Sequence, residues 1–487
     1  MSWLSKQILL LQRMSMIAFV DLLLASIGLS QTVPASPEHP WHGSAEFNMQ
    51  AYANNVTDSR FTLDQSKTYA LSELIDLAEA HNPATRTAWE RARSQAAALG
   101  ITRSELYPTL AAAALSQTES VQAFFGDRFH GQTTQTFELA LDLNYTVFDF
   151  GARAGRIDAA RARLLSANFA FNDTHRIVIN LVQQAYYRLL SAIGQEGAAQ
   201  ASLTNAKSVQ QAAEERLNNG LATLPDVLEA RSATAQAEYD LQAVVGAEEI
   251  ARGDLATAVG TSASVAIRIQ PLDQLRTPDS ISETVEEAID RAFAQRPDLM
   301  QQAAEIRTAN ATLKEARAAY YPSLSLNVSP AVPSLYGIQR PFDWSHTVDL
   351  TGSVSFNLKW TVFDGGARKN RTTQAQADIH AAEAQTNLKK NQIADEVWTA
   401  YSTLNTAFRQ HKTAIALLEA ASESYNAALE SYNYGLRNLL DVTAAQRSLA
   451  QARSADVFAR TQVLTALADL AFATGDSIQT NNGRSHP

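Results

Sequence analysis

Two stretches of the chain alternate apolar and polar side chains over about ten residues or more, one at 137–145 and the other at 348–360. A period of two is typical of a β-strand whose faces meet different surroundings, and this length suits a tilted strand that crosses a lipid bilayer. Weaker alternation before each stretch predicts a partner strand. We therefore expect two β-hairpins, at about 109–147 and about 323–362.

After each expected hairpin the pattern becomes that of a very long helix. The segments from Gly151 to Gly220 and from Gly366 to Gly435 contain no proline and few glycines. At 1.5 Å per residue each would form a helix of roughly 100 Å. A second helix returns from each glycine, which predicts long helix pairs at about 152–259 and about 367–474. Apolar residues at spacings of three and four form two adjacent rows, which favours neighbours on both sides and a cylinder, with an antiparallel coiled-coil rod as the alternative.

The two halves of the chain repeat one another. YTVFDFGAR from Tyr145 returns as WTVFDGGAR from Trp360, and NNGLATLPDVLEA from Asn218 returns as NYGLRNLLDVTAA from Asn433. The separation stays near 215 residues, which is far too long for a solenoid and indicates a tandem duplication. We expect structural repeats at 71–260 and 282–475, joined by a linker at 261–281.

The two ends of the chain have no counterpart in this repeat. Lys6 and Arg13 precede an apolar core at 14–30, the order of a secretory signal peptide at 1–30. Asp21 interrupts that core, so a buried N-terminal helix is the alternative. Residues 31–70 are expected to be an irregular segment, and residues 476–487 a disordered tail.

Each strand-to-helix junction combines aromatic residues with an aspartate, a glycine and an arginine. Apolar residues that stop at an aspartate predict the end of a strand, and the glycine permits the turn into a helix whose first turn the aspartate can cap. The aromatic residues lie where an interfacial girdle is expected, and the arginines lie just outside it, where headgroups meet water. The junction residues are Tyr145, Phe148, Asp149, Gly151, Arg153, Trp360, Phe363, Asp364, Gly366 and Arg368.

Composition excludes several classes of function. The formal net charge is −10, so a nucleic-acid partner is not expected, because phosphate binding needs a basic face. The chain has no cysteine, which excludes disulfides, thiolate metal sites and a cysteine nucleophile. It also lacks phosphate-loop, nucleophile-elbow and zinc-protease motifs, and its nine histidines lack metal-ligand spacing. We expect no enzyme activity, no metal and no cofactor.

The strands also constrain the assembly. No run of 18 apolar residues follows residue 30, so a membrane crossing would need a closed barrel. Four strands cannot close one, since the smallest membrane barrels have about eight. The chain must therefore oligomerise, unless the strands form a soluble sandwich.

The order and repetition of these motifs resemble the TolC family of outer-membrane efflux proteins over about residues 70–476. The resemblance implies a mainly α fold with β-strands, in which three chains share a 12-stranded β-barrel in the outer membrane and a 12-helix α-barrel through the periplasm. It also implies a passive exit duct that works with a periplasmic adaptor protein and an inner-membrane transporter of the RND or ABC type. The turns that match the adaptor-docking positions contain Gly220, Leu221, Ala222, Gly435 and Leu436.

The resemblance further implies a gate at the periplasmic end. The matching residues are Asp226, Tyr432, Arg437 and Asp441, of which Asp441 belongs to an aspartate ring. The chain departs from the family pattern at Pro225, and at Ala444, where some members have a further aspartate. The alternative role for the two aspartates is simply to cap or solvate the returning helices.

We expect the chain to be an outer-membrane channel. A non-conducting periplasmic coiled-coil scaffold is the alternative of a different class. Within the channel class, type I protein secretion is the alternative to small-molecule efflux.

Overall fold

The computed structural model describes residues 49, 61, 63–64, 66–125, 127–272, 278, 280, 283–339 and 345–476. The expected signal peptide at 1–30, most of the segment at 31–70 and the tail beyond residue 476 lie outside the described residues. The description below concerns the compact unit that begins at Phe61.

Both halves of the chain contain the same series of elements. Equivalent helices have equal lengths of 11, 22, 67 and 36 residues in the two halves. The first half contains α3 (Leu71–His81), α4 (Pro83–Ser104), β2 (Thr109–Phe125), β3 (Arg128–Phe148), α5 (Ala152–Asn218) and α6 (Leu224–Val259). The second half contains α7 (Val285–Gln295), α8 (Pro297–Ala318), β5 (Ser323–Gln339), β6 (Ser345–Val348), β7 (Thr351–Lys359), α9 (Ala367–Asn433) and α10 (Leu439–Thr474). Two short strands, β1 (Thr68–Tyr69) and β4 (Arg268–Ile269), pair in parallel.

One antiparallel sheet joins the two halves. Its order is β2, β3, β5 and then β6 and β7, which both pair with the far side of β5. The pairing of β3 with β5 links the two hairpins into a single sheet. At its two outer edges lie β2 on one side and β6 with β7 on the other.

The last strand differs from the sequence prediction. The alternating pattern at 348–360 predicts one strand, whereas the structure has β6 and β7 with a break at Asp349 and Leu350. The break faces Pro333, whose nitrogen carries no hydrogen to donate, so only the bond from Asp349 N to Pro333 O remains there, at 3.4 Å. Pro330 similarly interrupts the pairing of β5 with β3.

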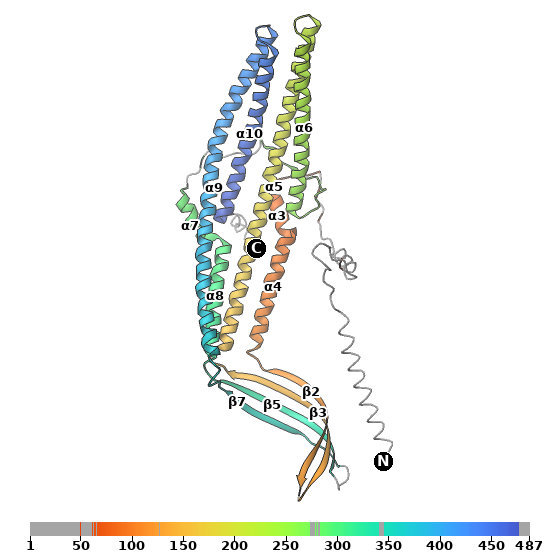
Figure 1. Cartoon of the computed structure of the whole chain (residues 1–487), viewed down its shortest axis with the longest axis vertical. Coiled ribbons are helices and arrows are strands. Elements are labelled where there is room, and N and C mark those ends of the chain that lie inside the picture. Colours follow the sequence, from red (N-terminus) through yellow and green to blue (C-terminus); the bar gives the residue numbers. More distant parts are fainter. Residues whose placement is uncertain are drawn as a thin grey trace, which may run out of the picture. The chain divides into compact units, whose positions relative to one another are not determined.

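The long helices run side by side, with the strands at one end and the α5–α6 and α9–α10 turns at the other (Figure 1). Each 67-residue helix packs against two shorter helices that meet end to end. At the end of α6, Asn82 Nδ2 donates to Ala258 O over 3.0 Å, and at the end of α10, Arg296 Nη1 donates to Ala473 O over 3.1 Å. The pairs α4 with α6 and α8 with α10 thereby cover α5 and α9 over most of their length.

A buried ion pair fixes the second of these joints. Arg296 is 1% exposed, and its Nη2 donates to Asp298 Oδ2 over 2.6 Å, while Lys389 Nζ of α9 lies 2.8 Å from the same oxygen. Burial by itself raises the pKa of Asp298, but the bonds from Arg296 and Lys389 outweigh it and hold the pKa well below its usual range. The carboxylate is therefore charged at neutral pH and ties α8 to α9.

Helices of sufficient length and apolar character to cross a membrane are absent from the described residues.

The close approach of α5 to α8 generates a stability prediction. A Cβ on Gly155 would lie 2.7 Å from Glu315 N, a backbone atom of α8 that cannot move aside alone. Gly155→Ala should therefore lower the free energy of unfolding by about 1–3 kcal/mol. The measurement is denaturant unfolding followed by helical circular dichroism.

Gly197→Ala in the same helix is the matched control. Nothing lies within 4 Å of a Cβ at Gly197. The control should gain about 0.5–1 kcal/mol, because alanine loses less backbone freedom in a helix. Equal effects of the two substitutions would contradict the close packing of α5 on α8.

Candidate functional site

The two helical turns that the sequence predicts end α5 and α9 in the same way. Gly220 has φ +69° and Gly435 has φ +76°, the left-handed region that favours glycine. Leu221 N donates to Arg216 O over 2.8 Å, and Leu436 N donates to Ser431 O over 2.8 Å, so both turns use the same C-terminal capping motif. Both glycines therefore take part in the C-terminal caps of their helices.

These turns also present apolar side chains to solvent. Leu221 is 67% exposed and Leu436 is 79% exposed, while Ala222 is half-buried. Leu224 and Leu440, in the first turns of the returning helices, are also exposed, at 59% and 63%, so the turns carry several exposed apolar side chains.

Asp226 caps the helix in which it lies. Its Oδ2 accepts hydrogen bonds from Thr223 N over 2.9 Å and from Thr223 Oγ1 over 2.7 Å. These bonds, and to a smaller degree the charge of Arg216, lower the pKa of Asp226 below its ordinary value. Within one chain Asp226 therefore acts as a capping residue of α6.

Asp441 is placed differently. Its backbone nitrogen donates to Asn438 Oδ1 over 2.9 Å, so Asn438 caps α10 and the Asp441 side chain is exposed. Asp441 is therefore a solvent-exposed acidic side chain in the first turn of α10 and not its cap.

The predicted gate residues do not form a bonded cluster within one chain. Tyr432 is 4% exposed, and burial raises the pKa of its phenol. Arg437 is exposed, and among the described residues neither Asp226 nor Tyr432 has a hydrogen bond to it. A bond between Arg437 and Asp226 or Tyr432 would therefore have to join two different chains.

Arg216 is the residue at these turns that the sequence prediction missed. Its Nη1 donates to Tyr432 O over 2.8 Å and to Asn433 O over 3.2 Å, and its guanidinium lies 4.7 Å from the centre of the Tyr432 ring. A basic residue in the last turn of a helix is a recognisable signal for capping. The sequence gives no sign that Arg216 bonds the end of another helix.

The strand-to-helix junctions are built twice on one plan. Asp149 Oδ2 accepts from Arg153 N over 2.8 Å and from Arg153 Nε over 3.1 Å. Asp364 Oδ2 accepts from the same two atoms of Arg368, over 3.0 and 2.9 Å. Gly151 has φ +95° and Gly366 has φ +90°. The aspartates thus cap the first turns of α5 and α9, as their order in the sequence predicts.

Aromatic side chains surround these junctions on the surface of the chain. Tyr145 is half-buried, Phe148 and Phe363 are exposed, and Trp360 Nε1 donates to Tyr320 O over 3.2 Å. Two further aromatic residues, which the sequence prediction omitted, complete the group. Phe150 stacks on Tyr321, with ring centres 4.9 Å apart.

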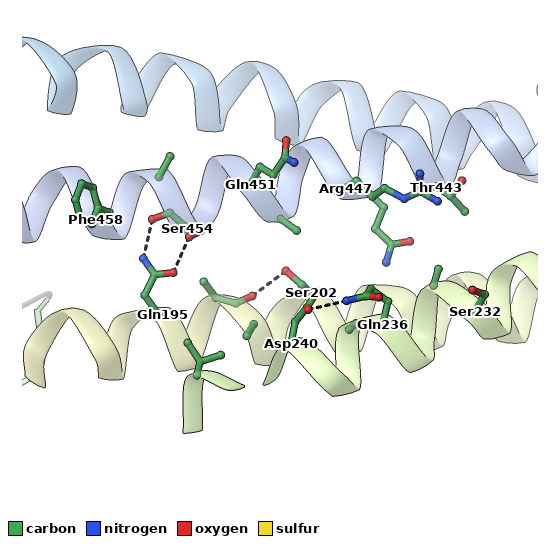
Figure 2. Close-up of a pocket in the computed structure, with 18 residues that line it drawn as sticks. Gln195, Ser202, Ser232, Gln236, Asp240, Thr443, Arg447, Gln451, Ser454 and Phe458 are labelled. Carbon is green, nitrogen blue, oxygen red and sulfur yellow. Dashed lines mark hydrogen bonds between the residues drawn. The ribbon is translucent and has the colours of Figure 1, made fainter. Parts of the chain in front are cut away.

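A cavity of about 930 Å³ lies between α5, α6 and α10 (Figure 2). Gln195 Nε2 donates to Ser454 O over 2.8 Å across it, and Ser454 Oγ donates back to Gln195 Oε1 over 2.7 Å (Figure 2). The cavity therefore separates two helical hairpins that polar bonds connect. The described residues include no group of three or more acidic or histidine side chains that could hold a metal ion.

Comparison with known proteins gives consistent matches. The family model described as outer membrane efflux protein matches residues 74–261 and 288–476. The chain is 27% identical over 416 residues to Protein CyaE of Bordetella pertussis, which covers 85% of each chain. It is 26% identical over 451 residues to outer membrane protein OprJ of Pseudomonas aeruginosa, which covers 91% of each.

Solved structures share the fold. The crystal structure of the CmeC outer membrane channel of Campylobacter jejuni superposes with a TM-score of 0.71 at 19% identity, over 92% of this chain and 95% of that one. The family match extends over most of the chain and confirms the resemblance drawn from the repeated motifs. The chain belongs to the TolC-like family of outer membrane efflux proteins, and its place is the bacterial outer membrane.

Proposed function

We propose that three copies of this chain form one passive exit duct through the outer membrane. In this assembly the strands build a 12-stranded barrel that continues into a 12-helix cylinder in the periplasm. The observation that carries the proposal is the sheet itself. It is four strands wide, and the outer edge of β2 on one side and that of β6 and β7 on the other have no partner strand among the described residues.

Unpaired edges are costly in lipid, because no water is present to bond the free N–H and C=O groups. Pairing the β2 edge of one chain with the β7 edge of the next satisfies both edges. Four strands from each of three chains give twelve, which exceeds the minimum of about eight for a membrane barrel. The strands also carry exposed apolar side chains suited to a lipid-facing surface, among them Leu139, Leu141, Val354, Phe356 and Leu358.

The scaffold alternative explains less of this structure. A periplasmic coiled-coil rod could account for the long helices, but it has no use for strands of 17 and 21 residues with exposed apolar side chains. The channel explains the strands and the helices together.

The proposed duct works with partners at its periplasmic end. The exposed leucines at the helical turns, Leu221 and Leu436, suit contact with an adaptor protein, with Gly220, Ala222 and Gly435 shaping the turns. The adaptor in turn connects to an inner-membrane transporter that supplies energy. Co-purification of an RND transporter would indicate small-molecule efflux, and that of an ABC transporter would indicate type I protein secretion.

A gate between neighbouring chains is part of the proposal. Arg437 is exposed and has no described bond within its own chain, which suits a bond to Asp226 of a neighbouring copy. Asp441 is exposed near the same turn, and three copies of it would surround the axis with negative charge.

The absence of cysteine from the chain permits a direct test of the trimer. Ala113→Cys on β2 is combined in turn with Ser353→Cys, Ser355→Cys or Asn357→Cys on β7, because the strand registers place all four side chains on the same face of the sheet. One register should give covalent dimers and trimers on a denaturing gel after oxidation, because β2 and β7 of different chains pair. Ala140→Cys on β3 with the same partners is the control, since both neighbours of β3 belong to its own chain. Only monomers in all three edge pairings would overturn the proposed assembly.

Loss of the proposed gate bond should open the channel. Arg437→Ala removes the donor to the neighbouring Asp226, so single-channel conductance in planar bilayers should rise several-fold, about the effect of losing one bond to a charged group. Arg409→Ala, in α9 but far from the turn that holds Arg437, is the control. Unchanged conductance in Arg437→Ala would reject the gate bond.

Removal of the charge at the constriction should weaken cation binding. Asp441→Asn should raise the concentration of a multivalent cation such as hexamminecobalt needed for half block by roughly tenfold, because three charges disappear from one narrow ring. Asp456→Asn, further along α10, should leave block unchanged. Identical block in both variants would show that Asp441 does not line the constriction.

A further inference from the structure

We infer that Arg216 holds the two helical turns of one chain together and thereby sets how easily the channel opens. This inference rests on the proposed function, because it assigns a positioning role within the closed end of the duct. Arg216 acts within a chain, whereas the bond proposed for Arg437 acts between chains.

The contacts of Arg216 connect the two repeats. It lies in the last turn of α5, yet its Nη1 donates to Tyr432 O and Asn433 O at the end of α9, over 2.8 and 3.2 Å. The last carbonyl groups of a helix carry partial negative charge, so a guanidinium bound there gains from charge as well as from hydrogen bonds. One side chain of the first hairpin thus caps a helix of the second.

Tyr432 makes this contact stronger. Its ring lies 4.7 Å from the guanidinium and belongs to an apolar cluster that includes Val209 and Ala213 of α5 as well as Leu439 and Val442 of α10. A cation over an aromatic face is attracted by the ring, and more so where water is excluded. Arg216 therefore covers the apolar contact between the hairpins at their tips.

Arg216 also acts on the predicted gate residue of its own hairpin. Its positive charge contributes to holding the Asp226 carboxylate in the charged form. Displacement of Arg216 would therefore change the charge environment of Asp226 as well as free the end of α9. The two turns are coupled through this one guanidinium.

Other basic side chains near the turns lack this arrangement. Arg231 of α6 bonds Glu214 of α5 over 3.0 Å, which is a bond within one hairpin. Arg447 of α10 bonds Glu229 of α6 over 3.0 Å and does join the hairpins, but its side chain is 68% exposed, and such surface pairs contribute little. Arg216 combines a bond between hairpins with partial burial.

The arrangement of the turns leaves two polar atoms without partners. Arg216 Nε and Tyr432 Oη are buried and have no hydrogen-bond partner among the described residues. Buried polar atoms without partners raise the free energy of a state. The bonds of Arg216 hold the two turns together, and the two unpaired atoms lower the free energy needed to separate them.

The test compares Arg216→Gln with Arg231→Gln in planar bilayers. Glutamine keeps a long polar side chain but loses the charge and the forked donors. Arg216→Gln should raise the ratio of open to closed time about tenfold, the factor expected for losing bonds from a charged donor. Arg216→Lys should fall between Arg216→Gln and the unchanged protein, because it keeps the charge without the fork. Arg231→Gln should behave as the unchanged protein.

A second readout separates positioning from general stability. The trimer band on a gel and the temperature at which helical circular dichroism is lost should be the same in Arg216→Gln and Arg231→Gln. If Arg216→Gln does not assemble, Arg216→Lys and Arg231→Lys replace the pair. The ratio of open to closed time should then rise in Arg216→Lys and stay unchanged in Arg231→Lys.

The outcomes distinguish this inference from the proposed function. Conductance that rises in Arg437→Ala but not in the Arg216 variants would overturn the role of Arg216 and leave the channel intact. An unchanged protein that forms no pores and no trimers would overturn both. A rise in the open-to-closed ratio of the Arg216 variants, with none in Arg231→Gln, would support the inference.

Discussion

The pairing of β-strand edges is the constraint on which the structure depends. In lipid each backbone N–H and C=O group needs a partner within the protein. The contact of β3 with β5 unites the two hairpins and leaves β2 and β7 as the outer edges of each chain. In the proposed assembly further copies close the barrel, and that closure arranges the helices that follow the strands. The Asp149 and Asp364 caps matter for this reason, since they fix the direction in which each helix leaves its strand.

At the end opposite the strands, the positions of the two helical turns depend on equal helix lengths. Both α5 and α9 have 67 residues, so their turns lie at the same end, and Gly220 and Gly435 finish them with the same capping motif. That equality brings Arg216 within reach of the last carbonyl groups of α9. A channel that opens at this end must separate contacts of two kinds, those within a chain through Arg216 and those proposed between chains through Arg437.

Features set by local chemistry could be predicted from the sequence, and features set by tertiary placement could not. Glycines mark the ends of α5 and α9 to within about two residues, and Asp149 caps its helix through atoms four residues away. The break between β6 and β7 depends on Pro333 of another strand, which no pattern within 348–360 reveals. The contact of Arg216 with Tyr432 joins residues of different repeats, and the stack of Phe150 on Tyr321 does the same. Such contacts need the packed structure.

The central claim is that each chain supplies a third of a closed barrel. Native mass spectrometry of the protein released from detergent measures the number of chains in each particle directly. The account predicts three chains per particle, stable until the strands unfold. A folded particle of a single chain, with β2 and β7 protected from hydrogen exchange, would contradict it, because those edges would then have found partners without a second copy.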